Sequence, residues 1–236
     1  MKKLILASAA AVALTVSLPA VAAAQVDHVD LSYQRLETPI GDGDGFAASG
    51  ALLFGTGSPI NLQLDASIAQ SESVTGGGAN LHAFHRNESF AVGGFVGFTD
   101  SEFIDAIIQY GLEGAFYLDA VTLGATVAQL DSDDLGLEAT TLQGAATFFP
   151  NDNVSLGASY GNVDVDGVGD FDVFGLAAEF KMNGPVSFFA NYGRAEDLDV
   201  DIFGLGVRYN FGGKTLKERD RSGASMGKST AAQFLF

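Results

Sequence analysis

The feature that most constrains the fold is a two-residue alternation near the end of the chain, at residues 202–211, which read IFGLGVRYNF. Apolar and aromatic residues fall on every second position, and glycine, arginine and asparagine lie between them. Successive side chains of a β-strand point to opposite faces, so the pattern predicts a strand with one apolar face and one small or polar face. Such a strand suits a barrel wall that separates lipid from water.

The end of this stretch, Tyr209-x-Phe211, resembles the C-terminal sorting strand of Gram-negative outer-membrane β-barrel proteins, the porin-like family among them. The resemblance implies an outer-membrane location and recognition by the barrel assembly machinery. The residues that it implies as the assembly signal are Phe203, Leu205, Val207, Tyr209 and Phe211.

The first residues of the chain have the pattern of a secretory signal peptide. Lys2 and Lys3 are followed by an apolar run at 4–18 and by three alanines that end at Ala24. Positive, apolar and small-residue regions in this order predict cleavage between Ala24 and Gln25. The predicted organisation is a signal peptide at 1–24, a transmembrane β-barrel at 25–212 and a polar, basic tail at 213–236.

No later apolar run approaches the roughly 20 residues that a spanning helix needs, so a membrane protein of this sequence must be a closed barrel. We predict an all-β, antiparallel, up-and-down transmembrane barrel of 12 strands, with 10 or 14 as alternatives. The predicted strands are 26–36, 45–54, 59–70, 79–86, 90–98, 106–118, 121–130, 140–149, 154–163, 171–182, 186–194 and 202–211.

The predicted connectors alternate between tight turns and longer loops along the chain. Short turns and long loops mark the periplasmic and external ends of outer-membrane barrels, so we expect the tight turns in the periplasm. Residues 25–212 hold 27 acidic and 5 basic residues, and 18 of the acids lie in the long loops. So acidic a body excludes nucleic acid as a partner. The chain has no cysteine, so barrel closure rather than disulfides must stabilise it.

The tail is the exception to this charge pattern, because residues 213–236 hold 5 basic and 2 acidic residues. It follows a complete sorting strand, and a thirteenth strand would break the even strand number. We therefore predict a mobile periplasmic tail. The alternative is a basic plug inside or below an acidic lumen.

Five charged residues share the inward parity of their strands and are the predicted pore-lining set. Opposed charges across a lumen filter small charged solutes, although the same residues can pair and fill the interior instead. Many inward glycine, alanine, serine and threonine residues favour a narrow open channel, although Phe95 and Phe189 also fall on the inward face. The predicted pore-lining residues are Asp65, Glu113, Glu179, Lys181 and Arg208.

Other polar residues suggest weaker sites. Clustered carboxylates can hold a divalent cation in a loop, but the spacing departs from the EF-hand and solvated hairpin tips are the favoured interpretation. Arg35 and Arg194 have outward parity at the external ends of their strands, where guanidiniums can bind lipopolysaccharide phosphates or simply reach water. The candidate cation ligands are Asp164, Asp166, Asp170 and Asp172.

We predict a porin-like channel of the outer membrane for passive diffusion of small hydrophilic solutes, favouring cations. No cofactor is expected, and the protein is not predicted to be an enzyme. One alternative is a structural or surface-recognition barrel with a filled lumen. The other is a lipid-modifying barrel enzyme, which rests only on His28, His82 and His85, none of them in a recognisable catalytic motif.

Overall fold

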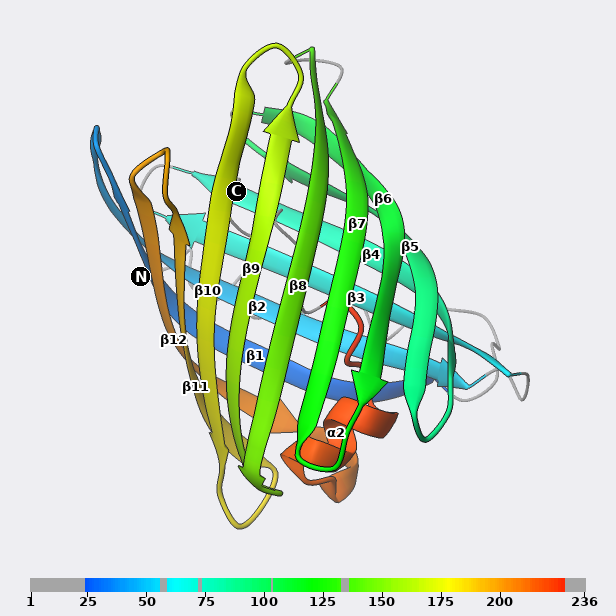
Figure 1. Ribbon diagram of the computed structural model, residues 1–236. Helices are drawn as coiled ribbons and strands as arrows, with labels where there is room; N and C mark the ends of the chain where they lie inside the picture. The colour runs from blue at the N-terminus through cyan, green and yellow to red at the C-terminus, as the bar shows by residue number, and fades with distance from the viewer. Residues whose placement is uncertain (1–23, 56–58, 72–73, 103, 133–135, 228–236) are drawn as a thin grey trace.

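The computed structural model describes residues 24–55, 59–71, 74–102, 104–132 and 136–227. Its strands form one closed antiparallel barrel in which each strand pairs with its neighbours in sequence and β1 pairs with β12 (Figure 1). The predicted fold class and strand number are confirmed. The predicted signal peptide lies outside the described residues except for Ala24, where β1 begins.

The strands are β1 (Ala24–Thr38), β2 (Gly41–Gly55), β3 (Ile60–Ser71), β4 (Thr75–Arg86), β5 (Phe90–Ser101), β6 (Ile104–Tyr117), β7 (Val121–Ser132), β8 (Leu137–Asn151), β9 (Val154–Val165), β10 (Gly169–Lys181), β11 (Val186–Ala195) and β12 (Val200–Asn210). After β12 come the 3₁₀ turn η1 (Phe211–Gly213) and the short helix α2 (Leu216–Ser222). Among the described residues, no helix is long and apolar enough to cross a membrane.

Most strands are longer than predicted, and the extra residues lie mainly at the ends with the long loops. Strand β2 begins at Gly41 instead of 45, and β8 at Leu137 instead of 140. The hairpin β1–β2 pairs as far as Thr38 with Gly41, so part of the predicted loop is strand. The sequence predicts these residues as loop because glycine and acidic residues are uncommon in strands. In the structure, pairing with the neighbouring strand overrides that preference.

The outer face of the barrel is apolar and exposed. On β12, Phe203, Leu205, Val207 and Tyr209 are between 43 and 63% exposed, and Phe211 follows at 38%. Large apolar side chains on the other strands are similarly exposed. A continuous band of this kind is what a lipid-facing barrel surface requires. The predicted assembly-signal residues thus share this outward face at the closing strand.

The inner face tolerates two phenylalanines because glycines lie beside them. Phe189 pairs with Gly206 of β12, and a Cβ built on Gly206 would lie 2.2 Å from the ring atom Cζ of Phe189. Phe95 also has a glycine as its cross-strand partner, Gly111 of β6. The inward glycines of the last strand therefore create space for side chains from the neighbouring strand, which explains their place in the alternation.

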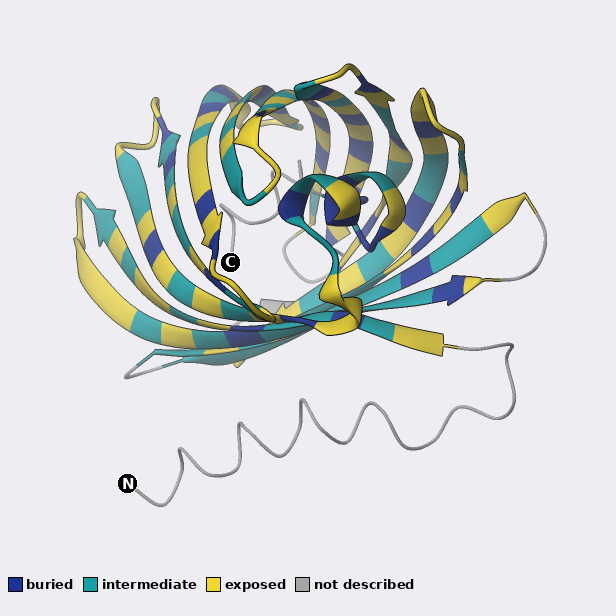
Figure 2. Ribbon diagram, turned by 90° about the horizontal axis from the view of Figure 1, so that it is seen from below, coloured by how far each residue is buried: buried dark blue, intermediate teal, exposed yellow. Residues whose placement is uncertain are grey.

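Residues 214–227, which the sequence predicts as part of a mobile tail, are instead folded against the barrel. Thr215 caps α2, and its hydroxyl accepts a hydrogen bond from the Glu218 amide while the Glu218 carboxylate accepts one from the Thr215 amide. The helix lies within the ring of strands at the tight-turn end (Figure 2). Leu216, Arg219, Asp220, Ala224 and Met226 are buried. We call residues 214–227 the luminal segment; the rest of the predicted tail, 228–236, lies outside the described residues.

Candidate functional site

The luminal charges form an alternating chain of two acids and two guanidiniums that crosses from β1 to the luminal segment. Asp30 and Arg208 face each other across the β1–β12 pair, and Arg208 binds both carboxylate oxygens of Asp30 at 2.6 Å. Its third nitrogen donates to Glu179 at 3.0 Å. Arg219 of α2 then binds both Glu179 oxygens, at 2.8 and 2.6 Å. Bidentate pairs of this geometry are strong and directional.

Neighbouring polar groups hold this chain in place. Ser187 donates to Glu179 at 2.5 Å, and the Asn210 side chain donates to Ser187 at 3.0 Å. Asn210 also accepts a hydrogen bond from Arg219. The guanidinium of Arg208 lies over the Phe189 ring, 5.4 Å from its centroid. Each charge in the chain therefore has an opposite charge beside it, which lowers the free-energy cost of removing these side chains from water.

A second luminal cluster lies on β3, β4 and β6. His82 is buried, with Nδ1 2.6 Å from Glu113 Oε1 and Nε2 3.1 Å from Asp65 Oδ2. Its ring stacks on Phe95. Gln63 donates to the Met226 carbonyl and accepts from the Met226 amide, and the Gly227 amide donates to Glu113 at 2.8 Å. The cluster thus holds the distal end of the luminal segment.

The structure therefore separates the five predicted pore-lining residues into three settings. Glu179 and Arg208 belong to the alternating chain, and Asp65 and Glu113 to the histidine cluster. Lys181 is buried at the tight turn after β10, where its ammonium donates to the Gly184 carbonyl at 2.6 Å. All five lie on the inner side, but Lys181 stabilises a turn instead of facing the middle of the lumen.

An open part of the lumen remains beside the luminal segment. A cavity of about 320 Å³ lies along the inner faces of β8–β12, and small residues such as Gly157, Gly175 and Ala177 line it. Glu179, Phe189, Arg208 and Arg219 also line this cavity. The alternating chain of charges therefore borders space that a small solute can occupy.

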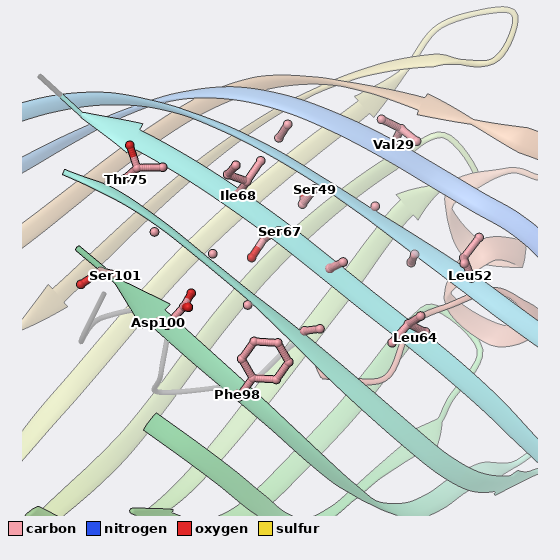
Figure 3. Close-up of a pocket in the computed structure, with 18 of the residues that line it drawn as sticks. Val29, Ser49, Leu52, Leu64, Ser67, Ile68, Thr75, Phe98, Asp100 and Ser101 are labelled. Carbon is pink, nitrogen blue, oxygen red and sulfur yellow. The ribbon is translucent and has the colours of Figure 1, made fainter. Parts of the chain in front are cut away.

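A second hollow, of about 720 Å³, lies against β1–β5 (Figure 3). Its large apolar side chains lie on the outward faces of their strands. Their cross-strand pairing places them on the same face of the sheet as the exposed residue Tyr209, and on the opposite face from Arg208. We therefore place this hollow on the apolar outer surface and not on a solute path. These side chains are Val29, Leu52, Leu64, Ile68 and Phe98.

At the long-loop end, the arginines are already paired with carboxylates. Arg35 donates to Glu37 and Asp42, each at 2.8 Å. Arg194 donates to Asp199 at 2.8 Å and to Asp201 at 2.9 Å. Both guanidiniums are at the long-loop ends of their strands, where a lipid phosphate would have to compete with these acids. Lipopolysaccharide contact stays a prediction.

The four candidate cation ligands lie along the β9–β10 hairpin. Asp164 and Asp170 are paired across the two strands, and Asn162 donates to Asp170 and Asp172. Within the described ranges, no group of three or more histidine, aspartate or glutamate side chains is arranged to hold a metal ion. A loop-bound divalent cation stays a prediction.

Sequence reasoning missed three residues of the luminal site: Asp30, His82 and Arg219. Asp30 has the inward parity of β1 and could have been included by that rule alone. In the sequence, His82 is only one of three histidines outside any catalytic motif, but it is buried between two acids from strands on either side. The pattern Thr215-x-x-Glu218 is a capping box that predicts the start of α2. No local pattern places Arg219 against Glu179.

The comparisons with known proteins agree with this architecture. Residues 39–217 match the family described as Gram-negative porin, so the chain belongs to that family. The predicted porin function and outer-membrane location are thereby confirmed. No curated protein sequence matches the chain.

Solved porin structures share the fold. The structure "KdgM porin" has a TM-score of 0.62 at 11% identity, covering 77% of this chain and 99% of that one. "KdgM porin in complex with disordered oligogalacturonate" gives 0.63 at 12% identity, with 77 and 99% coverage. A NanC porin structure gives 0.62 at 7% identity, with 78 and 100% coverage. At these identities the likeness shows the fold alone.

Proposed function

We propose that this porin conducts small neutral or cationic hydrophilic solutes and favours cations at low salt. The observation that carries the proposal is the charge of the long-loop end. Of the 27 acidic residues between 25 and 212, 18 fall in the predicted long loops, where Arg35 and Arg194 are the basic residues at the strand ends. A mouth of one sign attracts ions of the opposite sign by focusing the field.

The middle of the lumen contributes less to ion preference. In the alternating chain, Asp30 and Glu179 are matched by Arg208 and Arg219. Because these charges cancel locally, we expect selectivity to come from the mouth. Exposed mouth charges are screened by salt, since the Debye length is about 10 Å at 0.1 M and about 3 Å at 1 M.

Reversal potentials in planar bilayers test this proposal. Potassium should be preferred over chloride at low salt, and the preference should fall at high salt. A variant with Asp164, Asp166, Asp170 and Asp172 replaced by asparagine should lose part of the low-salt preference, whereas Glu88→Gln, at an exposed tight turn, should not. Anion preference at low salt would contradict the mouth argument, and absence of conductance would contradict channel activity.

The ligand of a structural neighbour cannot be assigned directly to this protein. One neighbour is described in complex with oligogalacturonate, whose sugars carry carboxylates. Such a polyanion would meet like charge at the acidic hairpins of this chain. We therefore propose neutral and cationic solutes rather than acidic oligosaccharides.

A barrel with a filled lumen is the second candidate, because the luminal segment occupies the tight-turn end. It predicts no conductance from the full chain. We infer that the protein is not a lipid-modifying enzyme. Among the described residues, His28 contacts Asp27, His82 contacts Glu113 and His85 contacts the Pro59 carbonyl, so none of these contacts pairs an imidazole with a hydroxyl nucleophile.

We also propose three partners at the outer surface. The outward alternation that ends in Tyr209 and Phe211 supports recognition by the barrel assembly machinery. Outer-membrane lipid covers the apolar band, and lipopolysaccharide is the proposed neighbour of Arg35 and Arg194. A chain that ends after Phe211 tests the assembly signal, because it should still give a folded, heat-modifiable species in the membrane fraction.

A further inference from the structure

The luminal segment is fixed to the barrel at both of its ends. At the start, the amide of Leu216 donates to the Asp152 carbonyl at 2.8 Å, in the turn between β8 and β9. Thr122 of β7 donates to Asp220 at 2.6 Å. At the other end, Arg86 of β4 donates to the Gly223 carbonyl at 2.7 Å and to Ser225 at 2.8 Å. Contacts with β4, β7 and the β8–β9 turn therefore hold the segment in one position.

Two glycines allow this close approach. A Cβ on Gly223 would lie 2.5 Å from Asp27 Oδ1, and a Cβ on Gly227 would lie 2.9 Å from His82 Cε1. Gly227 also has φ +80°, a backbone conformation that residues with a Cβ rarely adopt. The segment therefore follows the inner wall at distances that larger residues would prevent.

After α2, the segment covers one side of the lumen and leaves the other side open. Its end packs against β3, β4 and β6 through Gln63, Arg86 and Glu113. The cavity of about 320 Å³ lies on the opposite side, along β8–β12, and Arg219 forms part of its lining. A solute that uses this cavity passes between the barrel wall and the luminal segment.

The charge of the segment also matters at this point. Residues 214–227 carry four basic side chains and two acidic ones. Arg219 is the basic residue that reaches the cavity, and it neutralises Glu179. Without it, Asp30 and Glu179 would share the single guanidinium of Arg208, and the cavity would gain negative charge.

We propose that the luminal segment is the constriction of this porin, setting both the width of the solute path and, through Arg219, its charge. This inference rests on the proposed channel function. The lumen of a 12-stranded barrel is wider than the filled interior of an eight-stranded barrel and narrower than the pore of a 16-stranded one. A folded segment inside a lumen of this width therefore decides how much of it is open. The constriction enters from the tight-turn end, opposite the acidic hairpins.

Single-channel conductance of chains with different C-termini tests this constriction. A chain that ends after Gly213 lacks the segment and should show a several-fold rise in conductance and a stronger preference for potassium. A chain that ends after Gly227 keeps the segment and should behave as the full chain does. Heat-modifiable mobility checks that each chain is folded.

A matched pair of charge variants tests the role of Arg219 with the segment in place. Arg219→Gln should shift the reversal potential toward cations. Lys217→Gln removes the same charge from the same helix, but Lys217 faces the exposed Asp119 at 3.4 Å and does not line the cavity, so no shift is expected. This pair decides the charge argument if the shortened chain fails to fold.

The outcomes separate the two proposals. Equal conductance and selectivity of the full chain and the chain ending after Gly213 overturn the constriction but leave the channel intact. A silent full chain with a conducting short chain also overturns it, since the segment would then close the pore. If every folded variant is silent, the proposed channel function fails and the constriction fails with it.

Discussion

Both ends of the barrel contain arginine–carboxylate pairs, but the pairs at one end are exposed to water and those at the other end are largely buried. At the long-loop end, the side chains of Arg35 and Arg194 are 41 and 37% exposed, and their partners are hairpin acids. At the tight-turn end, Arg208 and Arg219 are 19 and 10% exposed, and they share Glu179. The pair geometry is similar, whereas access to water differs.

Burial decides what these pairs contribute. An exposed pair contributes about 0–1 kcal/mol because water and salt screen it. Removing one partner of a buried pair costs about 3–5 kcal/mol because the remaining charge is left uncompensated. The long-loop end is therefore a charged surface that tolerates change, and the tight-turn end is a polar core that fixes the luminal segment.

The largest expected difference between the two ends is their accessibility on intact cells. The chain has no cysteine, so single cysteines at Asp166, in a long hairpin, and Asn183, in a tight turn, can be compared. A maleimide too large to pass the pore should label Asp166→Cys on intact cells and Asn183→Cys only after permeabilisation. The reverse result would show that the orientation of the barrel is opposite.

The next largest effect should come from Glu179→Gln, which leaves Arg219 without its carboxylate. We expect a loss of about 3–5 kcal/mol in the free energy of unfolding, measured by urea denaturation in lipid vesicles. Glu88→Gln, at an exposed tight turn, is the matched control and should stay within about 0.5 kcal/mol of the parent. Equal stability of the two variants would mean that the alternating chain of charges does not stabilise the barrel.

A smaller effect is expected from the double variant Arg35→Gln, Arg194→Gln at the long-loop end. Because both pairs are exposed, each should contribute only about 0–1 kcal/mol to the free energy of unfolding. Co-purifying lipopolysaccharide, measured by phosphate and fatty-acid content, tests the proposed contact. A clear loss of lipopolysaccharide supports it, and an unchanged content shows that the hairpin acids alone bind these arginines.

The smallest effect should come from protonation of Glu218 at the start of α2. The backbone amide of Thr215 donates to this carboxylate and lowers its pKa from the ordinary value of 4.5. The stabilisation is therefore present above pH 4.5 and is lost as the pH falls through the lowered pKa. Amide exchange at residues 216–218, corrected for intrinsic rates, should rise at acidic pH in the parent protein.

Glu218→Gln is the control for this titration. A glutamine side chain can still accept the Thr215 hydrogen bond but carries no charge to lose. Its corrected exchange rates should therefore change less with pH over the same range. Identical pH profiles for the parent and the variant would exclude Glu218 as the titrating group.

Much of the barrel could be predicted from the sequence because alternation is a local property. Val207, Tyr209 and Phe211 identify the outer face of the last strand without reference to any other strand. Strand ends were harder, since Gly41 and Leu137 begin strands only because a neighbouring strand pairs with them. The inward set was also found by parity, which is why all five predicted pore-lining residues lie on the inner side.

The sequence by itself determined the class of fold, the outward apolar surface and the concentration of acids at one end, because each follows from residue order along single strands. Only the tertiary structure decided which charges meet. Glu179 and Arg219 are 40 residues apart, and Asp30 and Arg208 are 178 apart. Closing β1 onto β12 and folding the luminal segment back into the ring bring them together, and no local pattern encodes that closure.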